Sequence, residues 1–347
     1  MPETDPRIRL HIQNPPSPEK APPGYPVRKS NPAFAITRAQ YDEACRRHPD
    51  VAAAVDVSFG ETRGEYEAGM VDAQVIVATT QQLLEQAPVR GPELRWAMVT
   101  SASFHKLLPV SGWLKPGALL VHNSGIHARK AGEFIAASLL MLNCRIPFFA
   151  TAKEERRWTP QIETSIEGKT LAVVGAGHVG GAGAARARGL GMHVLGVRRS
   201  GEPHEACHET VGPGELEGVL RRADFVLVAL PSTEETRGSI DRNVFAMMKK
   251  GAGLVATAPT PVFDFDALAE ALTSGHLSGA VLDNFEPEPV PPESPWWTLP
   301  NLVITPHTSC IDREQYSPLT LDLLFDNLRA DLAGDTLPTR ANIERGY

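Results

Sequence analysis

The sequence has few cysteines, no long hydrophobic run and no strong excess of charge, and each lack excludes a class of protein. Its four cysteines lie far apart and show no metal-ligand spacing, so we expect no metal site and a cytoplasmic protein with reduced thiols. No apolar run approaches the ~18 residues of a membrane span, and the polar N-terminus shows no signal-peptide core. A net charge of −7 argues against nucleic acid or an anionic membrane as the main partner.

Short apolar segments alternate with helical ones, which indicates an α/β protein with parallel sheets covered on both faces. A capping box at Thr37 predicts a helix to about His48, where Pro49 stops it. The stretch 15–32 holds seven prolines and is expected to be an extended loop of unassigned role. Strands are expected at 8–12, 54–57, 74–78, 95–99 and 119–121, and then at 171–174, 193–197, 225–230, 254–257, 278–282 and 302–305.

The length of 347 residues is enough for about two domains, and two helices suggest where the chain crosses between them. The strongly apolar helix Gly132–Asn143 should lead out of the first domain and be buried, for instance in a homodimer interface. The amphipathic stretch Tyr316–Leu332 should return to it, which brings both crossings together as a hinge. We therefore predict a flavodoxin-like substrate domain (1–127 and 317–347) and a doubly wound, six-stranded Rossmann-type domain (128–316).

The turn after strand 171–174 has the GxGxxG pattern of dinucleotide sites. Gly175 allows the tight turn, Gly177 lets the backbone approach a pyrophosphate, and Gly180 lets the next helix pack closely on the strand. The motif residues His178 and Val179 lead into that Ala-rich helix, expected over Ala182–Leu190, whose positive end would hold the pyrophosphate. A plain tight turn is the alternative, but the strand, helix and second strand around the motif favour a cofactor site.

The end of the second strand, 193–197, indicates which dinucleotide is bound. NAD sites usually carry an acidic residue there, which accepts hydrogen bonds from the ribose. This chain has Arg198, Arg199 and Ser200 instead, and these side chains attract a 2′-phosphate. We therefore expect NADP(H) as the cofactor, with NAD(H) as the less favoured choice and an exposed strand end without a ligand as the alternative.

Seven motifs follow one another over roughly two thirds of the chain. They are NSGIH (123–127), GAGHVG (175–180), LPSTEETRG (230–238), GAVLD (279–283), NFEPEP (284–289), WWTLPN (296–301) and TPH (305–307). In the order and spacing of these motifs, from about Leu94 onward, the chain resembles the D-2-hydroxyacid dehydrogenases, which include lactate, glyoxylate/hydroxypyruvate and phosphoglycerate enzymes. The first ninety residues resemble the family only in their alternation of strands and helices.

The resemblance implies a role for individual residues. His307 would be the proton donor and acceptor, and Glu288 its carboxylate partner. Asp283 would lie near the nicotinamide carboxamide. The backbone N–H groups of the substrate loop would hold the substrate carboxylate. The remaining cofactor residues would be Leu230, Pro231, Thr236 and Thr257, and the substrate loop would be Ser101, Ala102 and Ser103.

Elementary chemistry agrees with these roles. Hydride reduction of a ketone leaves an alkoxide that needs a proton, and a histidine beside a carboxylate supplies one near neutral pH. The alternatives are a structural histidine at a strand end for His307 and a solvated acid in a proline-rich loop for Glu288. Cys310 invites a nucleophile interpretation, but hydride transfer needs no thiol and no activating base can be placed beside it.

One departure from the family pattern concerns the substrate carboxylate. The family places an arginine after the strand that ends at Thr257, where it holds the carboxylate and polarises the keto group, and this chain has Pro259 there. Another cation such as Lys106, Arg129 or an arginine of a partner subunit replaces it, or the substrate lacks that carboxylate, or the reaction has been lost.

The sequence therefore predicts an NAD(P)-dependent oxidoreductase that acts on a small 2-keto or 2-hydroxy acid, such as glyoxylate or hydroxypyruvate. The rival hypothesis is a catalytically silent dinucleotide-binding protein, a sensor or corepressor. An acid–base pair favours the enzyme, and Pro259 favours the rival.

Overall fold

A computed structural model describes residues 7–17, 20, 32–86 and 91–346 of the chain. Most of the proline-rich stretch 15–32 lies outside these residues. The chain divides into two compact units, unit 1 (residues 1–126 and 312–347) and unit 2 (residues 127–311). The chain passes from one unit to the other after residues 126 and 311, whereas the sequence predicted these passages after residues 127 and 316.

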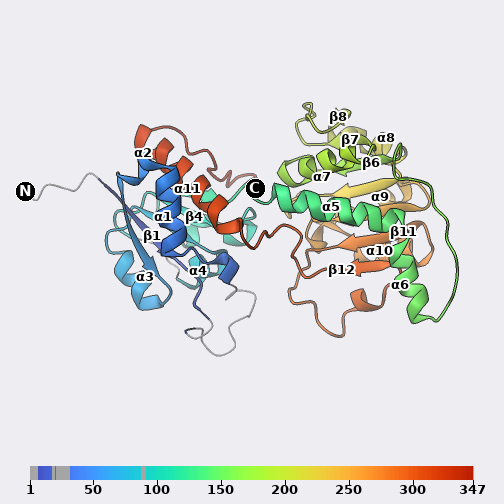
Figure 1. Ribbon diagram of the computed structural model, residues 1–347, viewed down its shortest axis with the longest axis horizontal. Coiled ribbons are helices and arrows are strands. Elements are labelled where there is room, and N and C mark those ends of the chain that lie inside the picture. The colour runs from blue at the N-terminus through green and yellow to red at the C-terminus, as the bar shows by residue number, and fades with distance from the viewer. Residues whose placement is uncertain (1–6, 18–19, 21–31, 87–90, 347) are drawn as a thin grey trace, which may run out of the picture. The chain divides into compact units, whose positions relative to one another are not determined.

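Unit 1 is built on a five-stranded parallel sheet (Figure 1). The strand order β2-β1-β3-β4-β5 is the flavodoxin-like order, as predicted. Strands β3 and β4 are wholly apolar and buried, which suits strands covered on both faces by crossover helices, whereas β1 and β2 alternate apolar residues with polar residues or glycine. The strands are β1 (Ile8–Gln13), β2 (Val55–Gly60), β3 (Val75–Ala78), β4 (Trp96–Val99) and β5 (Leu119–His122).

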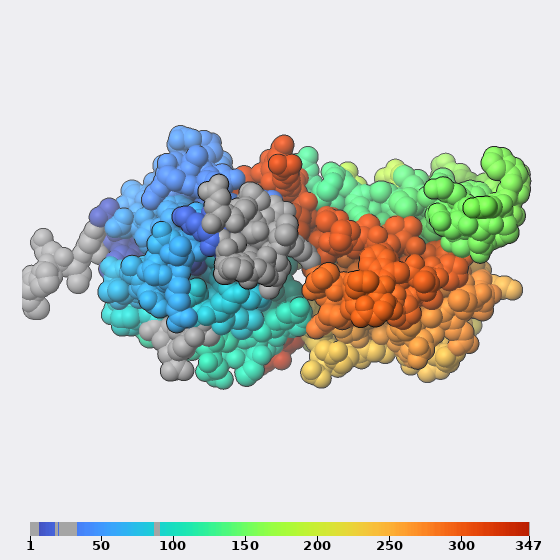
Figure 2. Space-filling view, turned by 90° about the horizontal axis from the view of Figure 1, so that it is seen from below, coloured from blue at the N-terminus to red at the C-terminus, as the bar shows by residue number. Residues whose placement is uncertain are grey.

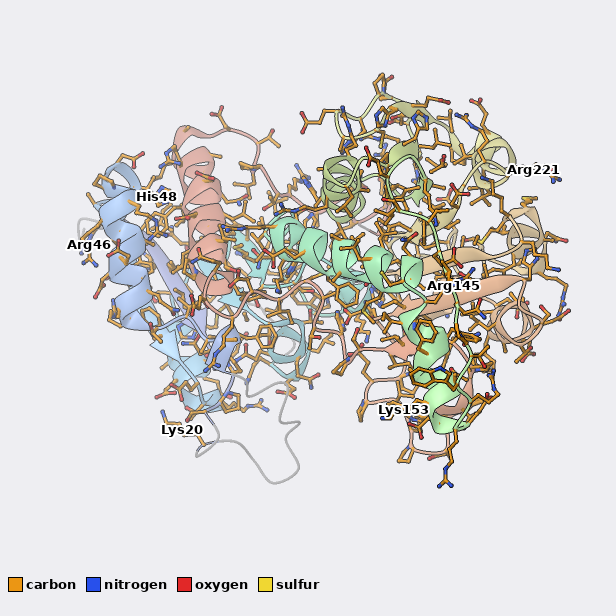
Figure 3. All side chains as sticks on the ribbon, turned by 45° about the vertical axis from the view of Figure 1, so that its right-hand side comes forward. Lys20, Arg46, His48, Arg145, Lys153 and Arg221 are labelled. Atoms are coloured by element: carbon orange, nitrogen blue, oxygen red, sulfur yellow. The ribbon has the colours of Figure 1, made fainter. Side chains whose placement is uncertain are left out.

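Helices cover both faces of the unit 1 sheet. One face packs against α1 (Arg38–Arg47), α2 (Pro49–Ala52) and α11 (Tyr316–Ala333), and the other against α3 (Arg63–Gly69) and α4 (Thr80–Glu85). The capping box at Thr37 is present as predicted. Pro49 does end α1, but it also begins α2, because the first turn of a helix needs no N–H from it. His48 stacks on Phe325 of α11, and Figure 3 labels it at the end of α1.

Unit 2 has a parallel sheet of seven strands in the order β12-β11-β10-β9-β6-β7-β8. Six strands were predicted. The additional one, β8, has only three residues and pairs with β7 alone at the edge of the sheet. The six neighbouring strands from β8 to β11, in the order β8-β7-β6-β9-β10-β11, follow the doubly wound Rossmann order. The strands are β6 (Thr170–Val174), β7 (His193–Val197), β8 (Glu209–Val211), β9 (Phe225–Val228), β10 (Ala252–Ala256), β11 (Leu277–Leu282) and β12 (Leu302–Ile304).

Two layers of helices enclose the unit 2 sheet. Figure 1 shows α5 (Ala128–Asn143) beside α7 (His178–Gly189) on one face, and α8 (Leu216–Leu220), α9 (Arg242–Met247) and α10 (Phe265–Thr273) pack on the other. The sequence did not predict α6 (Ile146–Glu154), and it placed the start of α7 too late, at Ala182. Within the described residues, no single helix is long and apolar enough to span a membrane, although the bent pair α5 and α6 together has the required length and composition.

The two ends of unit 2 lie side by side. The Nδ1–H of His127, at the start of α5, donates to the carbonyl oxygen of Cys310 at 3.1 Å. A carbonyl oxygen only accepts, so Nδ1 carries the proton of this bond, and burial lowers the pKa of His127. Both chain crossings therefore occur at one place on unit 2, as the sequence predicted.

Candidate active site

The glycine-rich turn of unit 2 is shaped for close approach of a ligand. Gly175 has φ +100°, and a Cβ there would lie 2.7 Å from the carbonyl oxygen of Ala229. A Cβ on Gly180 would lie 2.1 Å from the carbonyl oxygen of Gly175, so the helix can pack on the turn only without one. By contrast, no heavy atom lies within 4 Å of a Cβ built on Gly177, the N-cap of α7. The turn therefore leaves open space at the helix N-terminus, where an anion is favoured.

The three residues after β7 lie at the surface, next to this turn. Arg198 is half-buried, and Arg199 and Ser200 are exposed. The guanidinium of Arg199 forms an ion pair with Glu235, a residue of the loop that follows β9. Sequence reasoning missed Glu235. The only signal for it was that strands β7 and β9 both neighbour β6, which brings the loops after them close together.

The loop from Leu230 to Gly238 is held by its own threonines. The hydroxyl of Thr236 donates to the carbonyl oxygen of Pro231 at 2.6 Å and accepts the N–H of Thr233 at 2.9 Å. Leu230 and Pro231 are half-buried beside the glycine-rich turn, since Gly175 packs against Ala229. The buried hydroxyl of Thr257, after β10, has no hydrogen-bond partner among the described residues. An unsatisfied buried hydroxyl indicates that a ligand or water completes this part of the site.

His307 and Glu288 form the pair that the sequence predicted. The imidazole Nδ1 lies 2.8 Å from Oε1 of Glu288. That carboxylate also accepts the backbone N–H of Phe285 at 3.1 Å, which fixes its position. His307 has φ 54°, an uncommon conformation for a residue with a side chain and one that often occurs at functional sites. Both side chains remain partly exposed, so a small molecule can reach them.

Asp283 organises the loop that carries His307. Its side chain is buried at 1% exposure, and its Oδ1 accepts the hydroxyl of Thr305 at 2.5 Å and the N–H of Thr308 at 2.9 Å. Its Oδ2 accepts the N–H of Ser309 at 3.1 Å. The backbone N–H of His307 itself donates to the carbonyl oxygen of Asp283 at 2.8 Å. The family resemblance suggested a cofactor contact for Asp283, whereas these bonds give its carboxylate a second task that the sequence did not reveal.

Cys310 is unsuited to nucleophilic chemistry. Burial is the main cause that raises the pKa of its thiol to about 11, so the thiolate is scarce at neutral pH. Its Sγ lies 3.2 Å from the hydroxyl of Ser309. This environment agrees with the expectation that Cys310 does not act as a nucleophile.

Pro259 begins a tight turn that supports the loop of Glu288. It has φ −61° and ψ 145°, and its carbonyl oxygen accepts the N–H of Val262 at 3.0 Å. The next residue, Thr260, donates its N–H to the carbonyl oxygen of Asn284 and accepts the N–H of Glu286 on its hydroxyl. The turn thus holds the acidic loop in place, but its proline offers no charge to a substrate.

The predicted substrate loop lies in unit 1, directly after β4. The backbone N–H groups of Ser101, Ala102 and Ser103 donate no hydrogen bond to any described residue, which leaves them available to an anion. The ring of His122 bonds the carbonyl oxygen of Ala102 at 2.9 Å, and Ser103 bonds Nδ1 of His105 at 2.7 Å. Sequence reasoning missed these two histidines, although both directly flank expected elements.

The two candidate replacement cations are both exposed. Lys106 lies on a short 3-10 helix (His105–Leu107) beside the substrate loop of unit 1. Arg129 lies in the first turn of α5, in unit 2. Neither forms an ion pair within the part of the chain that the structure describes.

Comparison with known proteins identifies the family. A family model described as the D-isomer specific 2-hydroxyacid dehydrogenase, NAD binding domain, matches residues 136–309, which is half of the chain. The chain is 34% identical over 239 residues to a glyoxylate reductase of Korarchaeum cryptofilum, covering 66% of this chain and 71% of that protein. This match extends well beyond any single motif.

Solved structures agree at the level of the fold. A D-isomer specific 2-hydroxyacid dehydrogenase family protein of Aeromonas salmonicida aligns with a TM-score of 0.77 at 24% identity, covering 97% of this chain and 99% of that one. An NADPH-dependent glyoxylate/hydroxypyruvate reductase of Sinorhizobium meliloti, solved with NADP and sulfate, aligns with a TM-score of 0.74 at 20% identity, covering 98% and 100%. With the dinucleotide fold and the sequence matches together, the chain belongs to the D-isomer specific 2-hydroxyacid dehydrogenase family.

Proposed function

We propose that the protein is an NADP(H)-preferring reductase of a small 2-keto acid, with His307 as proton donor and Glu288 as its partner. The observation that carries the proposal is the 2.8 Å pair between these two side chains, in a partly exposed position after β12. A protein that only binds a dinucleotide needs no such pair. The family membership supplies the reaction class, the interconversion of a hydroxyl and a carbonyl group.

The geometry of the pair assigns the two ring nitrogens. A carboxylate only accepts hydrogen bonds, so Nδ1 of His307 donates to Glu288 and Nε2 is the atom that exchanges the proton with the substrate. In reduction, Nε2–H would give its proton to the new alkoxide oxygen, and in oxidation Nε2 would take it back.

The residues of unit 2 fit a dinucleotide. The open space at Gly177 and the N-terminus of α7 would accept the pyrophosphate, and the unsatisfied hydroxyl of Thr257 offers a further polar contact. Arg198, Arg199 and Ser200 would hold the 2′-phosphate that distinguishes NADPH from NADH. When bound, the nicotinamide supplies the hydride for the reduction. A charge-assisted hydrogen bond is worth about 1.5–3 kcal/mol, so we expect NADPH to bind at least about tenfold more tightly than NADH.

We assign the substrate carboxylate to unit 1. Three consecutive backbone N–H groups, of Ser101 to Ser103, can donate to an anion, and His105, Lys106 and His122 lie in or next to the same loop. This assignment makes unit 1 the substrate domain. Glyoxylate and hydroxypyruvate are the expected substrates because each is short and carries the carboxylate beside the keto or aldehyde carbon.

The rival hypothesis, a silent dinucleotide sensor, rests on Pro259 alone. An arginine at this position would give two parallel hydrogen bonds to a carboxylate, and its loss commonly costs on the order of 10²–10³ in rate. The ordered His307–Glu288 pair weighs against the rival. Steady-state assays of glyoxylate, hydroxypyruvate, pyruvate and a neutral ketone with NADPH and NADH test the choice. Turnover of a 2-keto acid supports the enzyme, and its absence for every substrate supports the sensor.

The role of His307 is tested by His307→Asn. We expect turnover to fall by at least about 10²–10³-fold, as for the loss of a general acid, while the dissociation constant of NADPH stays within about twofold. His276→Asn is a matched control, because His276 lies in the same unit and its ring, among the described residues, bonds the carbonyl oxygen of Phe245 and no carboxylate. A fully active His307→Asn enzyme would show that the proton comes from another group.

The protein is further expected to form a homodimer in a reducing compartment such as the cytoplasm. Apolar side chains on and after the bent pair α5 and α6 are exposed, with Trp158 at 97% and Ile162 at 95%. Figure 2 shows this bright green segment at the surface of unit 2, and Figure 3 labels Arg145 and Lys153 at the two ends of α6. Such a surface suits a second copy of the chain. All four cysteines are free. Sedimentation analysis of the wild type and of Trp158→Ser tests the dimer.

A further inference from the structure

The ion pair between Arg199 and Glu235 spans the glycine-rich turn. Strand β6 pairs with β7 on one side and β9 on the other, with Val174 opposite both Val197 and Val228. Arg199 follows β7 and Glu235 lies in the loop after β9, so the two side chains meet from opposite sides of the turn that ends β6. A dinucleotide on that turn would lie next to this pair.

The pair engages a cation that the proposed cofactor site requires. A guanidinium binds a carboxylate or a phosphate with the same planar set of N–H groups, so the carboxylate of Glu235 and a 2′-phosphate compete for Arg199. The pair is exposed, at 45% for the arginine and 70% for the glutamate, so water screens it and a ligand can displace it. The charge of Glu235 would also repel the phosphate, whereas a ribose hydroxyl could donate a hydrogen bond to it.

We propose that Glu235 is a specificity-determining residue for the cofactor, which competes with the 2′-phosphate for Arg199 and so reduces the preference for NADPH over NADH. The inference rests on the NADP site of the proposed function. The proposed effect depends on where the carboxylate of Glu235 lies, beside Arg199, and not on the total negative charge of the loop. The neighbouring Glu234 is also exposed but forms no ion pair within the described part of the chain.

The test is a calorimetric titration of NADPH and NADH into the wild type, Glu235→Gln and Glu234→Gln. Removing the competing charge should tighten NADPH binding by roughly three- to tenfold, which is the range for an exposed ion pair together with the repulsion of a nearby phosphate. NADH binding should change by less than about twofold, and Glu234→Gln should leave both dissociation constants near the wild type. The effect should shrink at high salt because the interaction is screened.

A double variant confirms the mechanism. When Arg199 is already replaced by Gln, adding Glu235→Gln should tighten NADPH binding by less than about twofold, because the cation for which Glu235 and the phosphate compete is absent. Unchanged or equally changed affinities for NADPH and NADH in Glu235→Gln would overturn the inference but leave the proposed function intact. If no variant bound either dinucleotide, the proposed function itself would fail. Circular dichroism of each variant verifies that the fold is kept.

Discussion

Asp283→Ala should both loosen the loop of His307 and slow the reaction. The buried carboxylate accepts three hydrogen bonds, two of them from the backbone N–H groups of Thr308 and Ser309. The third donor, the hydroxyl of Thr305, also lies 3.5 Å from the carbonyl oxygen of Leu282 and keeps a partner. Ser309 is buried, and leaving its N–H without an acceptor costs about 1–3 kcal/mol, whereas Thr308 is exposed and its N–H can turn to water. The free energy of unfolding should therefore fall by about 1–3 kcal/mol. Asp283→Asn keeps one acceptor oxygen and should cost about half as much.

The local effect separates a positioning role from a cofactor contact. Hydrogen exchange of residues 305–311 should accelerate in Asp283→Ala, because the N–H groups of Thr308 and Ser309 lose their acceptor. A displacement of about 1 Å at His307 should lower kcat by roughly 100-fold. Glu293→Ala, an exposed acid in a neighbouring loop, serves as the control. If kcat fell while exchange of residues 305–311 stayed at the wild-type rate, the carboxylate would act on the cofactor instead, and the positioning argument would be refuted.

Two further changes test other parts of the chain. Pro259→Arg should lower kcat/KM for glyoxylate by roughly tenfold, because a second cation would compete with the replacement cation for the substrate carboxylate; an increase measured in the same assay would show that the wild type has no replacement cation. His11, in β1, is buried and its pKa is lowered mainly by desolvation, so the unfolded chain takes up a proton near pH 6.5 before the folded chain does. Stability should therefore fall as the pH drops below about 6.5, by at most ~1.4 kcal/mol per pH unit for this group, and stay level above it. Urea unfolding between pH 5 and 8 should show that the free energy of unfolding falls less toward acid pH in His11→Gln than in the wild type. An equal fall in both proteins would rule out His11 as its cause.

Patterns with a strong local cause were predictable from the sequence. The alternation of apolar strands predicted both sheets, and the βαβ context of GAGHVG predicted the dinucleotide turn. The capping boxes at Thr62 and Thr79 begin α3 and α4 by the same mechanism as that at Thr37, so these helices carried a usable signal.

Other elements depend on tertiary contacts or on weak local signals. Helix α6 carries Pro147 in its first turn, where a proline is tolerated although it disfavours a helix elsewhere, so its local signal was weak. Strand β8 has three residues and no pattern of its own; only pairing with β7 makes it a strand. Three glycines in the first half of α7 lowered its helix propensity and delayed its predicted start.

The candidate site likewise combines contacts that the sequence predicted with contacts that depend on the tertiary structure. The TPH and NFEPEP motifs placed His307 and Glu288 correctly relative to each other, because a family pattern records which residues meet in space. Asp283 accepts its hydrogen bonds from Thr308 and Ser309 through their backbone N–H groups. Nearly every residue has such a group, so the sequence does not reveal these bonds. The Arg199–Glu235 pair joins residues 36 positions apart and depends on strand order alone.

The contact between His127 and Cys310 has a consequence for the ancestry and engineering of the chain. Residues 127–311 form one continuous segment whose two ends meet, so unit 2 is topologically an insert within unit 1. Joining ends that already touch needs only a short linker and costs little loop-closure entropy. Such a segment is suited to exchange between relatives and to circular permutation, with new termini placed in an exposed loop far from the glycine-rich turn. The fold thus allows the dinucleotide module to be transplanted while the surrounding unit keeps its own sheet.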